Sequence, residues 1–482
     1  MSAPALIALA LAMLASGSLC LDLLRVRAPG GMLQAGLGLA TGLGLTVLIL
    51  YVPLALGQRL DFRLVLVVLG LGTAAWVVRV ALRWRRAPLR ISPTAIAFAL
   101  AGLALAKLSV AAPFSSYDDR AIWGLKGKAL LVERGIDGAI FQDLDVVHYH
   151  RDYPLGLPLL MALCGDVGQL GHPEPDGTEP AEGAAEWVVR HGAVNAYAAF
   201  AVVWGLGIAM LAFGSLICAI QSKLARLAAV PLAVAPAVLL PWIAGDSWSL
   251  AGADLPLCLF VGGAAVAVLQ WRRGASMQWL ALAAFLAACG LMLKREAWIV
   301  VALLAVSAVV SGPRRPKLAD IGLCAAILVL VAAAPLAVGA RIPHPPFEED
   351  YLASLLASSP RLWLERLPLL PLYAWQALSK AHMEFFWLVI LIAAVPTCWR
   401  GGGAERMLAV WVVLHTLCVA AVFLVTPDQL AWHVNTALPR LMGHMAIPAG
   451  LIGVRSAALW LEALQGARHP ARAPSLGLQE TG

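Results

Sequence analysis

The residue types best suited to chemistry gather in one polar interval, which follows the fourth long apolar segment of the chain. The interval begins at Asp118 and Asp119, and 13 of the protein's 28 acidic residues lie between Pro113 and His191. A carboxylate in a partly dry cleft beside a like charge acquires a raised pKa, which suits a general base. The run Ser116-Tyr-Asp-Asp119 is also typical of a helix amino-terminal cap. The two interpretations are compatible, because a capped helix would hold the acid rigidly.

A second polar group, Lys294-Arg295-Glu296, separates two apolar segments without a proline or glycine turn. Such triplets are often interfacial anchors of membrane proteins. Two cations at a membrane boundary are also well placed to bind a lipid phosphate and to stabilise it as a leaving group. The triplet therefore predicts a phosphate-binding site, with the anchor as the alternative.

A third cluster lies just before Pro154 and includes His150, Asp152 and Tyr153. Together with His148, His150 forms a histidine pair spaced by two, as in some metal sites. Only one nearby carboxylate supports a metal, so we interpret the cluster as a polar substrate pocket and predict no metal site.

The last outer loop combines an aromatic ring, a proton carrier and a cation in Asp428, Trp432, His433, Asn435 and Arg440. Tryptophan at a membrane interface is usually an anchor, but among polar neighbours it can also stack on a sugar. A weaker cluster of the same kind places Asp246 and Asp254 on either side of Trp248.

The elements that must position these residues are membrane helices. The chain of 482 residues is 61% hydrophobic and only 13% charged, whereas a soluble domain is roughly 25% charged. Runs long enough to cross about 30 Å of hydrocarbon occur about thirteen times, which predicts an all-α polytopic membrane protein. They lie near 2–21, 32–56, 64–84, 93–112, 192–220, 227–243, 251–270, 277–292, 297–311, 318–340, 384–398, 407–426 and 437–461.

The net charge of +7 is not a nucleic-acid signature, because the basic residues cluster in alternate gaps between the spans. If these clusters are cytoplasmic, the acidic loop 113–191 lies on the outer face, together with residues 245–254, 341–383 and 427–440. We expect a multi-pass protein of the inner (plasma) membrane whose polar clusters face the periplasm or the exterior.

No separate soluble domain is predicted. Residues 1–92 are expected to form extra amino-terminal transmembrane helices, 93–465 the catalytic core, and 466–482 a cytoplasmic tail. Within the acidic loop, residues 121–134 have helical composition, and 154–170 predict a helix half-buried against the membrane surface. Residues 358–373 predict another outer surface element. The eight cysteines form no Cys-x-x-Cys pair and indicate neither a disulfide framework nor a zinc site.

The acidic loop contains two motifs, Tyr117-Asp-Asp-Arg-Ala-Ile-Trp-Gly-Leu-Lys126 and His150-Arg-Asp-Tyr-Pro-Leu-Gly-Leu-Pro158. They resemble the first outer loop of the GT-C superfamily of membrane glycosyltransferases, which includes lipid A aminoarabinose transferases and protein O-mannosyltransferases. Leu293-Lys-Arg-Glu296 is similar to a Lys-x-Glu step near the lipid phosphate in that superfamily. Residues 426–440 resemble a late motif of related bacterial proteins. The resemblance spans roughly 93–461.

The resemblance implies that an aspartate just after a transmembrane helix serves in catalysis, a position that Asp118 matches better than Asp119. It also implies surface helices in the first outer loop. The chain departs from the family pattern in having three extra spans before the usual first helix. It also carries no large carboxyl-terminal soluble domain, which speaks against the oligosaccharyltransferase type.

We therefore expect an inverting GT-C-type glycosyltransferase that moves a sugar from a polyprenyl-phosphate donor to a cell-envelope glycan or lipid on the outer face. The expected catalytic residues are Asp118 and Asp119, and the donor phosphate would be bound by Lys294, Arg295 and Glu296. Substrate contacts are expected from Arg120, His150, Asp152, Tyr153, His433 and Arg440. No cofactor is required by this interpretation, and a divalent ion is the alternative.

Two rival functions fit parts of the same pattern. A transporter or flippase for a lipid-linked substrate or small anion would carry its charges near mid-membrane and often shows internal repeats, whereas these polar residues cluster in outer loops. An oligosaccharide polymerase or ligase typically has its large outer loop late in the chain, whereas the largest loop here follows the fourth span.

Overall fold

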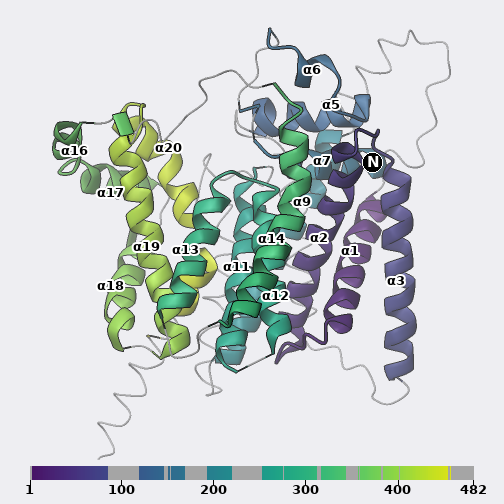
Figure 1. Cartoon of the computed structure of the whole chain (residues 1–482), viewed down its shortest axis with the longest axis horizontal. Helices are drawn as coiled ribbons and strands as arrows, with labels where there is room; N and C mark the ends of the chain where they lie inside the picture. The colour runs from purple at the N-terminus through teal and green to yellow at the C-terminus, as the bar shows by residue number, and fades with distance from the viewer. Residues whose placement is uncertain are drawn as a thin grey trace, which may run out of the picture.

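The computed structural model describes residues 3–84, 119–145, 150–151, 153–168, 193–219, 252–274, 276–311, 316–343, 356–357, 359–380, 384–400, 402–453 and 456. Every regular element in these ranges is helical, as predicted. The long helices stand side by side in a row, and shorter helices cover one end of the bundle (Figure 1).

Three helices open the chain: α1 (Ala3–Leu23), α2 (Gly31–Ala55) and α3 (Phe62–Trp84). Glycines allow α1 and α2 to pack backbone against backbone, since a Cβ at Gly42 would overlap the Met13 carbonyl group. One whole face of α2 is buried, and it packs against α1, α7 (Gly156–Gly168), α9 (Ala193–Ala219), α12 (Met277–Leu291) and α14 (Leu318–Gly339). The amino-terminal helices are therefore part of the same bundle as the predicted core.

The middle of the bundle is built from α11 (Asp254–Arg272), α12, α13 (Ala297–Val310) and α14. Nearly every residue of α11 is buried, which makes this helix the centre of the core. With 15 and 14 residues, α12 and α13 extend for only about 22 Å each, less than the roughly 30 Å of a bilayer core.

The carboxyl-terminal part comprises α16 (Pro360–Arg366), α17 (Leu370–Lys380), α18 (Glu384–Arg400), α19 (Gly403–Val425) and α20 (Leu430–Gly443), followed by a helical stretch at residues 446–453. The short α16 and α17 lie beside the upper part of α19 in Figure 1, in agreement with the predicted outer surface element. Most of the predicted last outer loop is helical, because α20 begins at Leu430.

The described part of the acidic loop forms the π-helix η1 (Asp119–Gly124), α5 (Leu125–Glu133), α6 (Ala139–Gln142) and α7. The helix predicted over 121–134 is confirmed. The prediction of a half-buried surface helix at 154–170 is wrong in its burial. All residues of α7 except Asp166 are buried, because the helix packs among α2, α5 and α9 rather than on the surface.

Within the described residues, six helices are long and apolar enough to cross a membrane: 4–23, 31–55, 62–83, 254–272, 318–339 and 403–425. Helices α3, α14 and α18 turn large apolar side chains outward, among them Leu71, Leu82, Leu330, Leu336 and Ile392. Exposed apolar faces of this extent are typical of contact with lipid. The class of multi-pass α-helical membrane protein is thus supported, although the predicted spans at 93–112 and 227–243 lie outside the described residues.

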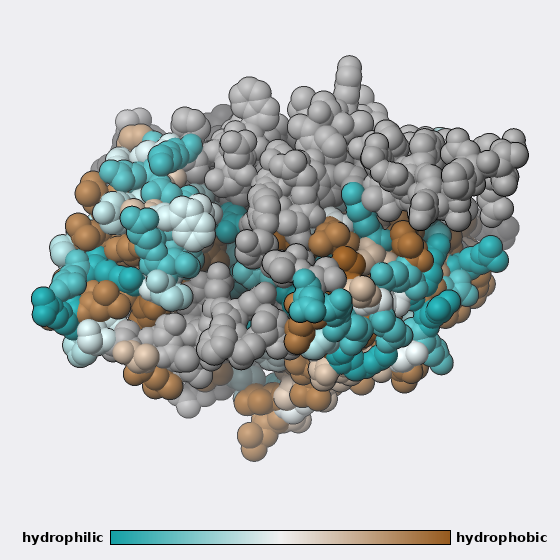
Figure 2. All heavy atoms as spheres, turned by 90° about the horizontal axis from the view of Figure 1, so that it is seen from above, coloured by the Kyte–Doolittle hydropathy of each residue, from teal (hydrophilic) through white to brown (hydrophobic). Residues whose placement is uncertain are grey.

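The two ends of the bundle carry different groups. At one end, Arg79 and Arg83 pair with Asp22. At the other end, the Leu60 N–H donates to the Arg134 carbonyl oxygen at 2.6 Å, and Arg341 bonds the Leu54 carbonyl oxygen. Asp137 of the acidic loop also lies 3.1 Å from Arg341. Two of the segments predicted to share one side therefore meet at this end, here called the loop end. Seen from this end, hydrophilic side chains cover much of the described surface (Figure 2).

Candidate functional site

A buried ionic network occupies the loop end of the bundle core. Lys294 Nζ lies 2.7 Å from Asp254 Oδ1, and His444 Nε2 lies 2.8 Å from the same oxygen. Their side chains are only 7%, 10% and 0% exposed for lysine, aspartate and histidine, respectively. Asp254 is the first residue of α11, Lys294 lies between α12 and α13, and His444 follows α20. Three distant segments therefore converge on one carboxylate.

The turn that presents Lys294 is fixed by hydrogen bonds to two other helices. The Met292 carbonyl oxygen accepts from the Tyr51 hydroxyl at 3.2 Å and from the Gly156 N–H at 2.9 Å. A Cβ at position 156 would overlap this same carbonyl group, so the close approach requires glycine. The turn is thus held between the end of α2 and the start of α7.

A second branch of the network runs from Lys294 toward the acidic loop. Glu296 Oε1 lies 3.8 Å from Lys294 Nζ and accepts a long hydrogen bond from the Tyr153 hydroxyl at 3.4 Å. The Tyr153 ring stacks on His150 with 4.4 Å between centroids and lies 5.5 Å from Trp123. The loop motif and the 294–296 triplet, which are far apart in sequence, therefore meet in space.

The backbone around His150 is also held tightly. Lys126 is fully buried on α5, and its ammonium donates to the His150 carbonyl oxygen. His150 adopts φ +54°, in the left-handed region that non-glycine residues rarely occupy. Such a conformation persists where the surroundings over-determine it, and it is common at functional sites.

Charge complementarity keeps the groups of the turn ionised. Burial alone would lower the pKa of Lys294, but the carboxylates of Asp254 and Glu296 raise it above its usual value. Burial would raise the pKa of Glu296, but the Lys294 ammonium lowers it below its usual value. Arg440 adds a further positive charge that acts on Asp254 and Lys294. The network combines two carboxylates with two cations and a histidine.

Two polar atoms of this network have no hydrogen-bond partner within the described residues. They are Glu296 Oε2 and His444 Nδ1, and both are buried. Buried polar atoms are hydrogen-bonded in most proteins. Each of these two atoms is therefore a position at which a substrate group or a water can bind. The arrangement can accept or relay a proton and can bind a polar ligand.

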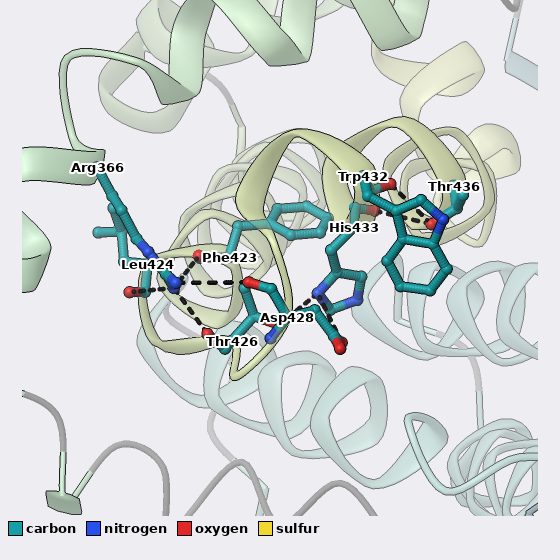
Figure 3. Close-up of polar contacts among 8 residues, drawn as sticks. All are labelled: Arg366, Phe423, Leu424, Thr426, Asp428, Trp432, His433 and Thr436. Carbon is teal, nitrogen blue, oxygen red and sulfur yellow. Dashed lines mark hydrogen bonds and ion pairs between the residues drawn. The ribbon is translucent and has the colours of Figure 1, made fainter.

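A separate polar cluster joins α16, the end of α19 and α20 (Figure 3). Arg366 donates to the carbonyl oxygens of Phe423, Leu424, Thr426 and Asp428, with the shortest distance, 2.7 Å, to Thr426. These contacts satisfy carbonyl groups that the end of a helix leaves unpaired.

His433 lies on the other side of the same turn. Its Nδ1 is 2.6 Å from Thr426 Oγ1 and 3.9 Å from Asp428 Oδ2. Burial lowers the pKa of His433, an effect opposed by Asp428 and reinforced by Arg440 and Arg366. The Thr426 hydroxyl and His433 Nδ1 share this hydrogen bond, and its direction is set by the imidazole tautomer. The exposed Trp432 ring lies beside His433, with 6.4 Å between centroids.

The structure brings together several of the predicted site residues. Lys294, Glu296, Tyr153 and His150 form one cluster, and Arg440 acts electrostatically on it. Arg295 lies on the same turn with an exposed side chain. His433 belongs to the Arg366 cluster, two helical turns before Arg440 on α20.

The structure describes only some of the predicted catalytic and substrate-binding residues. Asp118 and Asp152 lie outside the described residues, and so does His148. Asp119 and Arg120 are described as backbone at the start of η1. Their predicted roles therefore stay predictions.

Sequence reasoning missed His444 and Arg366. His444 lies within an apolar run predicted to span the membrane, where a lone histidine is itself the signal of a functional or paired group. Arg366 is the last residue of α16, a short helix that also carries Arg361 and Glu365. No local pattern in the sequence distinguishes a cation that caps another helix from one in solvent.

No group of three or more His, Cys, Asp or Glu side chains suited to a metal ion occurs in the part of the chain that the structure describes. Seven cysteines whose side chains are described form no disulfide: Cys20, Cys164, Cys258, Cys289, Cys324, Cys398 and Cys418. Comparison of the chain with protein-family models, with curated proteins and with solved structures found no match.

Proposed function

We propose that this chain is a membrane glycosyltransferase that uses a polyprenyl-phosphate sugar as donor and a cell-envelope glycan or lipid as acceptor. The observation that carries the proposal is the convergence at the loop end of three separately predicted polar groups: the His150–Tyr153 pair, the 294–296 triplet and Arg440 of α20. His444, which was not predicted, joins them through Asp254. A transferase for a lipid-linked donor needs its polar groups at this boundary between hydrocarbon and water.

In the proposed reaction, an acceptor hydroxyl oxygen attacks the anomeric carbon of the donor sugar. The bond from that carbon to the phosphate oxygen breaks, and polyprenyl phosphate leaves with the bonding electron pair. Asp118 takes the hydroxyl proton, and attack opposite the leaving group inverts the anomeric centre. Because no electrons are exchanged with a redox partner, the reaction balances without a cofactor.

The cations of the 294–296 turn take different parts in this proposal. Lys294 is committed to Asp254 and Glu296, so its role is to position the turn and set its positive potential. Arg295 projects from the same turn into an exposed position, where a guanidinium can bind the donor phosphate with two hydrogen bonds. In this proposal the loop end, where the turn lies, is at the level of the lipid phosphates.

The test is sugar transfer or release by the purified full-length protein, supplied with a panel of radiolabelled polyprenyl-phosphate sugars. Wild type is compared with Asp118→Asn, and with Asp145→Asn as an exposed acid of the same loop. Turnover by wild type and Asp145→Asn that is lost in Asp118→Asn supports the proposal. Absence of turnover with every donor, or equal turnover in all three proteins, contradicts it.

A transporter or flippase is the second candidate, and the buried Lys294–Asp254–His444 network is the observation that favours it. Ionisable residues inside a membrane bundle often mark proton or ion pathways. Reconstituted vesicles distinguish the two functions. Movement of a fluorescent lipid-linked sugar between leaflets, without sugar transfer, would favour the transporter.

A further inference from the structure

Two short helices beside the upper part of α19, α16 and α17, expose a group of large apolar side chains (Figure 1). Helix α16 has 7 residues and α17 has 11. At 1.5 Å per residue neither is longer than about 17 Å, so neither can span a membrane. Single exposed leucines are common on proteins, but a group of them marks a contact surface. The group is between 42% and 72% exposed and comprises Leu364, Leu367, Leu369, Leu372 and Trp375.

The sides of α16 differ in character. With about 100° between successive residues, Arg361 and Glu365 share one side, where they form an exposed ion pair at 2.9 Å. Arg366 lies on a second side and bonds carbonyl oxygens at the end of α19. Leu364 and Leu367 lie on the third side. Helix α16 therefore has a charged side, a side that packs on α19, and an exposed apolar side.

Helix α17 is apolar on two opposite faces. Leu370 and Ala377 are buried, and α17 packs mainly against α20. Leu372 and Trp375 lie on the opposite face and are exposed. A helix that is apolar on both faces is stable where both faces meet an apolar environment. Among the described residues, the bundle covers only one of the two faces.

The exposed face of α17 continues into the exposed apolar face of α18. The Trp375 ring meets the Phe385 ring edge-on, with 6.0 Å between centroids and 83° between the ring planes. Phe385, Val389 and Ile392 are all exposed, and they recur at the spacing of one helical face. The outward face of α18 has the character of a surface in contact with lipid. Because the two faces are continuous, lipid that covers α18 also reaches α17.

We propose that α16 and α17 bind the surface of the lipid bilayer, at the boundary between headgroups and hydrocarbon in the leaflet at their end of the bundle. Leu364, Leu372 and Trp375 insert among the first carbons of the acyl chains, and the ion pair of α16 faces water. Leucine and tryptophan on one side of a helix, with charges on another, are typical of interfacial binding. The same contact is expected whether the protein transfers a sugar or transports a lipid.

The test measures which reagents reach these positions when the full-length protein is reconstituted in phosphatidylcholine vesicles. The variants Leu364→Cys, Leu372→Cys and Arg361→Cys are each labelled with a nitroxide. Electron paramagnetic resonance then measures the collisions of the nitroxide with oxygen, which concentrates in hydrocarbon, and with a nickel chelate, which stays in water. Unsubstituted protein treated with the same label gives the background from the native cysteines.

We expect collisions with oxygen to dominate at Leu364→Cys and Leu372→Cys. Collisions with the nickel chelate should dominate at Arg361→Cys, the matched control on the charged side of α16. Ile392→Cys is the reference for a deeper position, because Ile392 lies about two helical turns from the start of α18. The two leucine positions should be shallower than this reference. All four side chains are exposed, so thermal unfolding of the labelled proteins should match that of the unsubstituted protein.

Three results would overturn the proposal. If the nickel chelate dominates at Leu364→Cys and Leu372→Cys, α16 and α17 lie in water. If both reagents collide rarely at these two positions, protein covers the face, as in an assembly with a second copy of the chain. If Leu372→Cys is as deep as Ile392→Cys, α17 lies within the hydrocarbon rather than at its surface.

Discussion

Lys294 and Asp254 are 40 positions apart in the sequence, and their charged atoms lie 2.7 Å apart in the core. The pair joins the turn between α12 and α13 to the first residue of α11. Either charge would be unfavourable without the other, because both side chains are buried away from water. The pair therefore constrains the geometry of the loop end.

Replacing Lys294 by methionine should destabilise the protein by about 3–5 kcal/mol, because Asp254 is left buried with only His444 beside it. Thermal unfolding in detergent measures the effect. Arg59→Met is the control, since it removes an exposed cation between α2 and α3 and should have little effect. Combining Lys294→Met with Asp254→Asn should recover part of the lost stability, because the unpaired buried charge is removed. Equal losses of stability in Lys294→Met and in the control would show that the Lys294–Asp254 ion pair does not account for the effect.

Gly156→Ala should disturb the same turn from the side of α7. A methyl group there would overlap the Met292 carbonyl oxygen, and overpacking of this kind costs about 1–3 kcal/mol. Gly322→Ala on α14 is the control, since a methyl group there meets no neighbour within 4 Å. Thermal unfolding should show a loss for the first variant and an unchanged or higher stability for the second. A stable Gly156→Ala protein would mean that α7 does not approach the turn this closely.

Arg366→Gln should destabilise the end of α19 by about 1.5–3 kcal/mol, because several of its carbonyl groups lose a charged donor. Arg361 lies five positions earlier and pairs with Glu365 on the exposed face of α16. Arg361→Gln should therefore cost about 0.5 kcal/mol or less. Hydrogen exchange at residues 423–428 distinguishes a local effect from global unfolding. Unchanged exchange there in Arg366→Gln would contradict the capping role.

His433 should make stability depend on pH. Its pKa is lowered in the folded protein, so the unfolded chain binds more protons as the pH falls below about 6.5. The contribution of His433 to folding stability is therefore constant above about pH 6.5. It decreases as the pH falls toward the lower pKa that His433 has in the folded protein. His433→Gln should remove this part of the slope between pH 7.5 and pH 5, measured by thermal unfolding. An equal slope in both proteins would assign the pH dependence to other groups.

Asp118→Asn should reduce sugar transfer by about 10²–10⁴-fold, the usual contribution of a general base, while leaving thermal stability unchanged. Asp119→Asn should have a smaller effect, because Asp118 matches the position of the catalytic aspartate better in the resemblance described above. A larger loss in Asp119→Asn would exchange the two roles.

Local sequence patterns predict some parts of this molecule well. Apolar runs predict the helical membrane class, and the composition of residues 121–134 predicts η1 and α5. The alternation of basic gaps predicts that residues 113–191 and 341–383 share a side, and the ion pair between Asp137 and Arg341 agrees with it. These features depend on residues within one or two helices.

Other parts could not be predicted, because they depend on which distant segments meet. Asp254 was a weak candidate until Lys294 and His444 were found beside it. The burial of α7 follows from its neighbours α2, α5 and α9, and an apolar stretch of 13 residues is equally compatible with a surface helix. Packing in the folded protein determines which of these distant segments come into contact. The periodicity of apolar residues carries no information about those contacts.

The position of the partners of Asp254 has a consequence for synthesis of the chain. Lys294 follows it by 40 residues and His444 by 190. At roughly 5–20 residues per second, a ribosome needs about 10–40 s to pass from Asp254 to His444. During that interval α11 is available for membrane insertion with its carboxylate incompletely paired, so the group must be protonated or held at the aqueous boundary. The core of the bundle can close around this charge only after the last of its helices has been made.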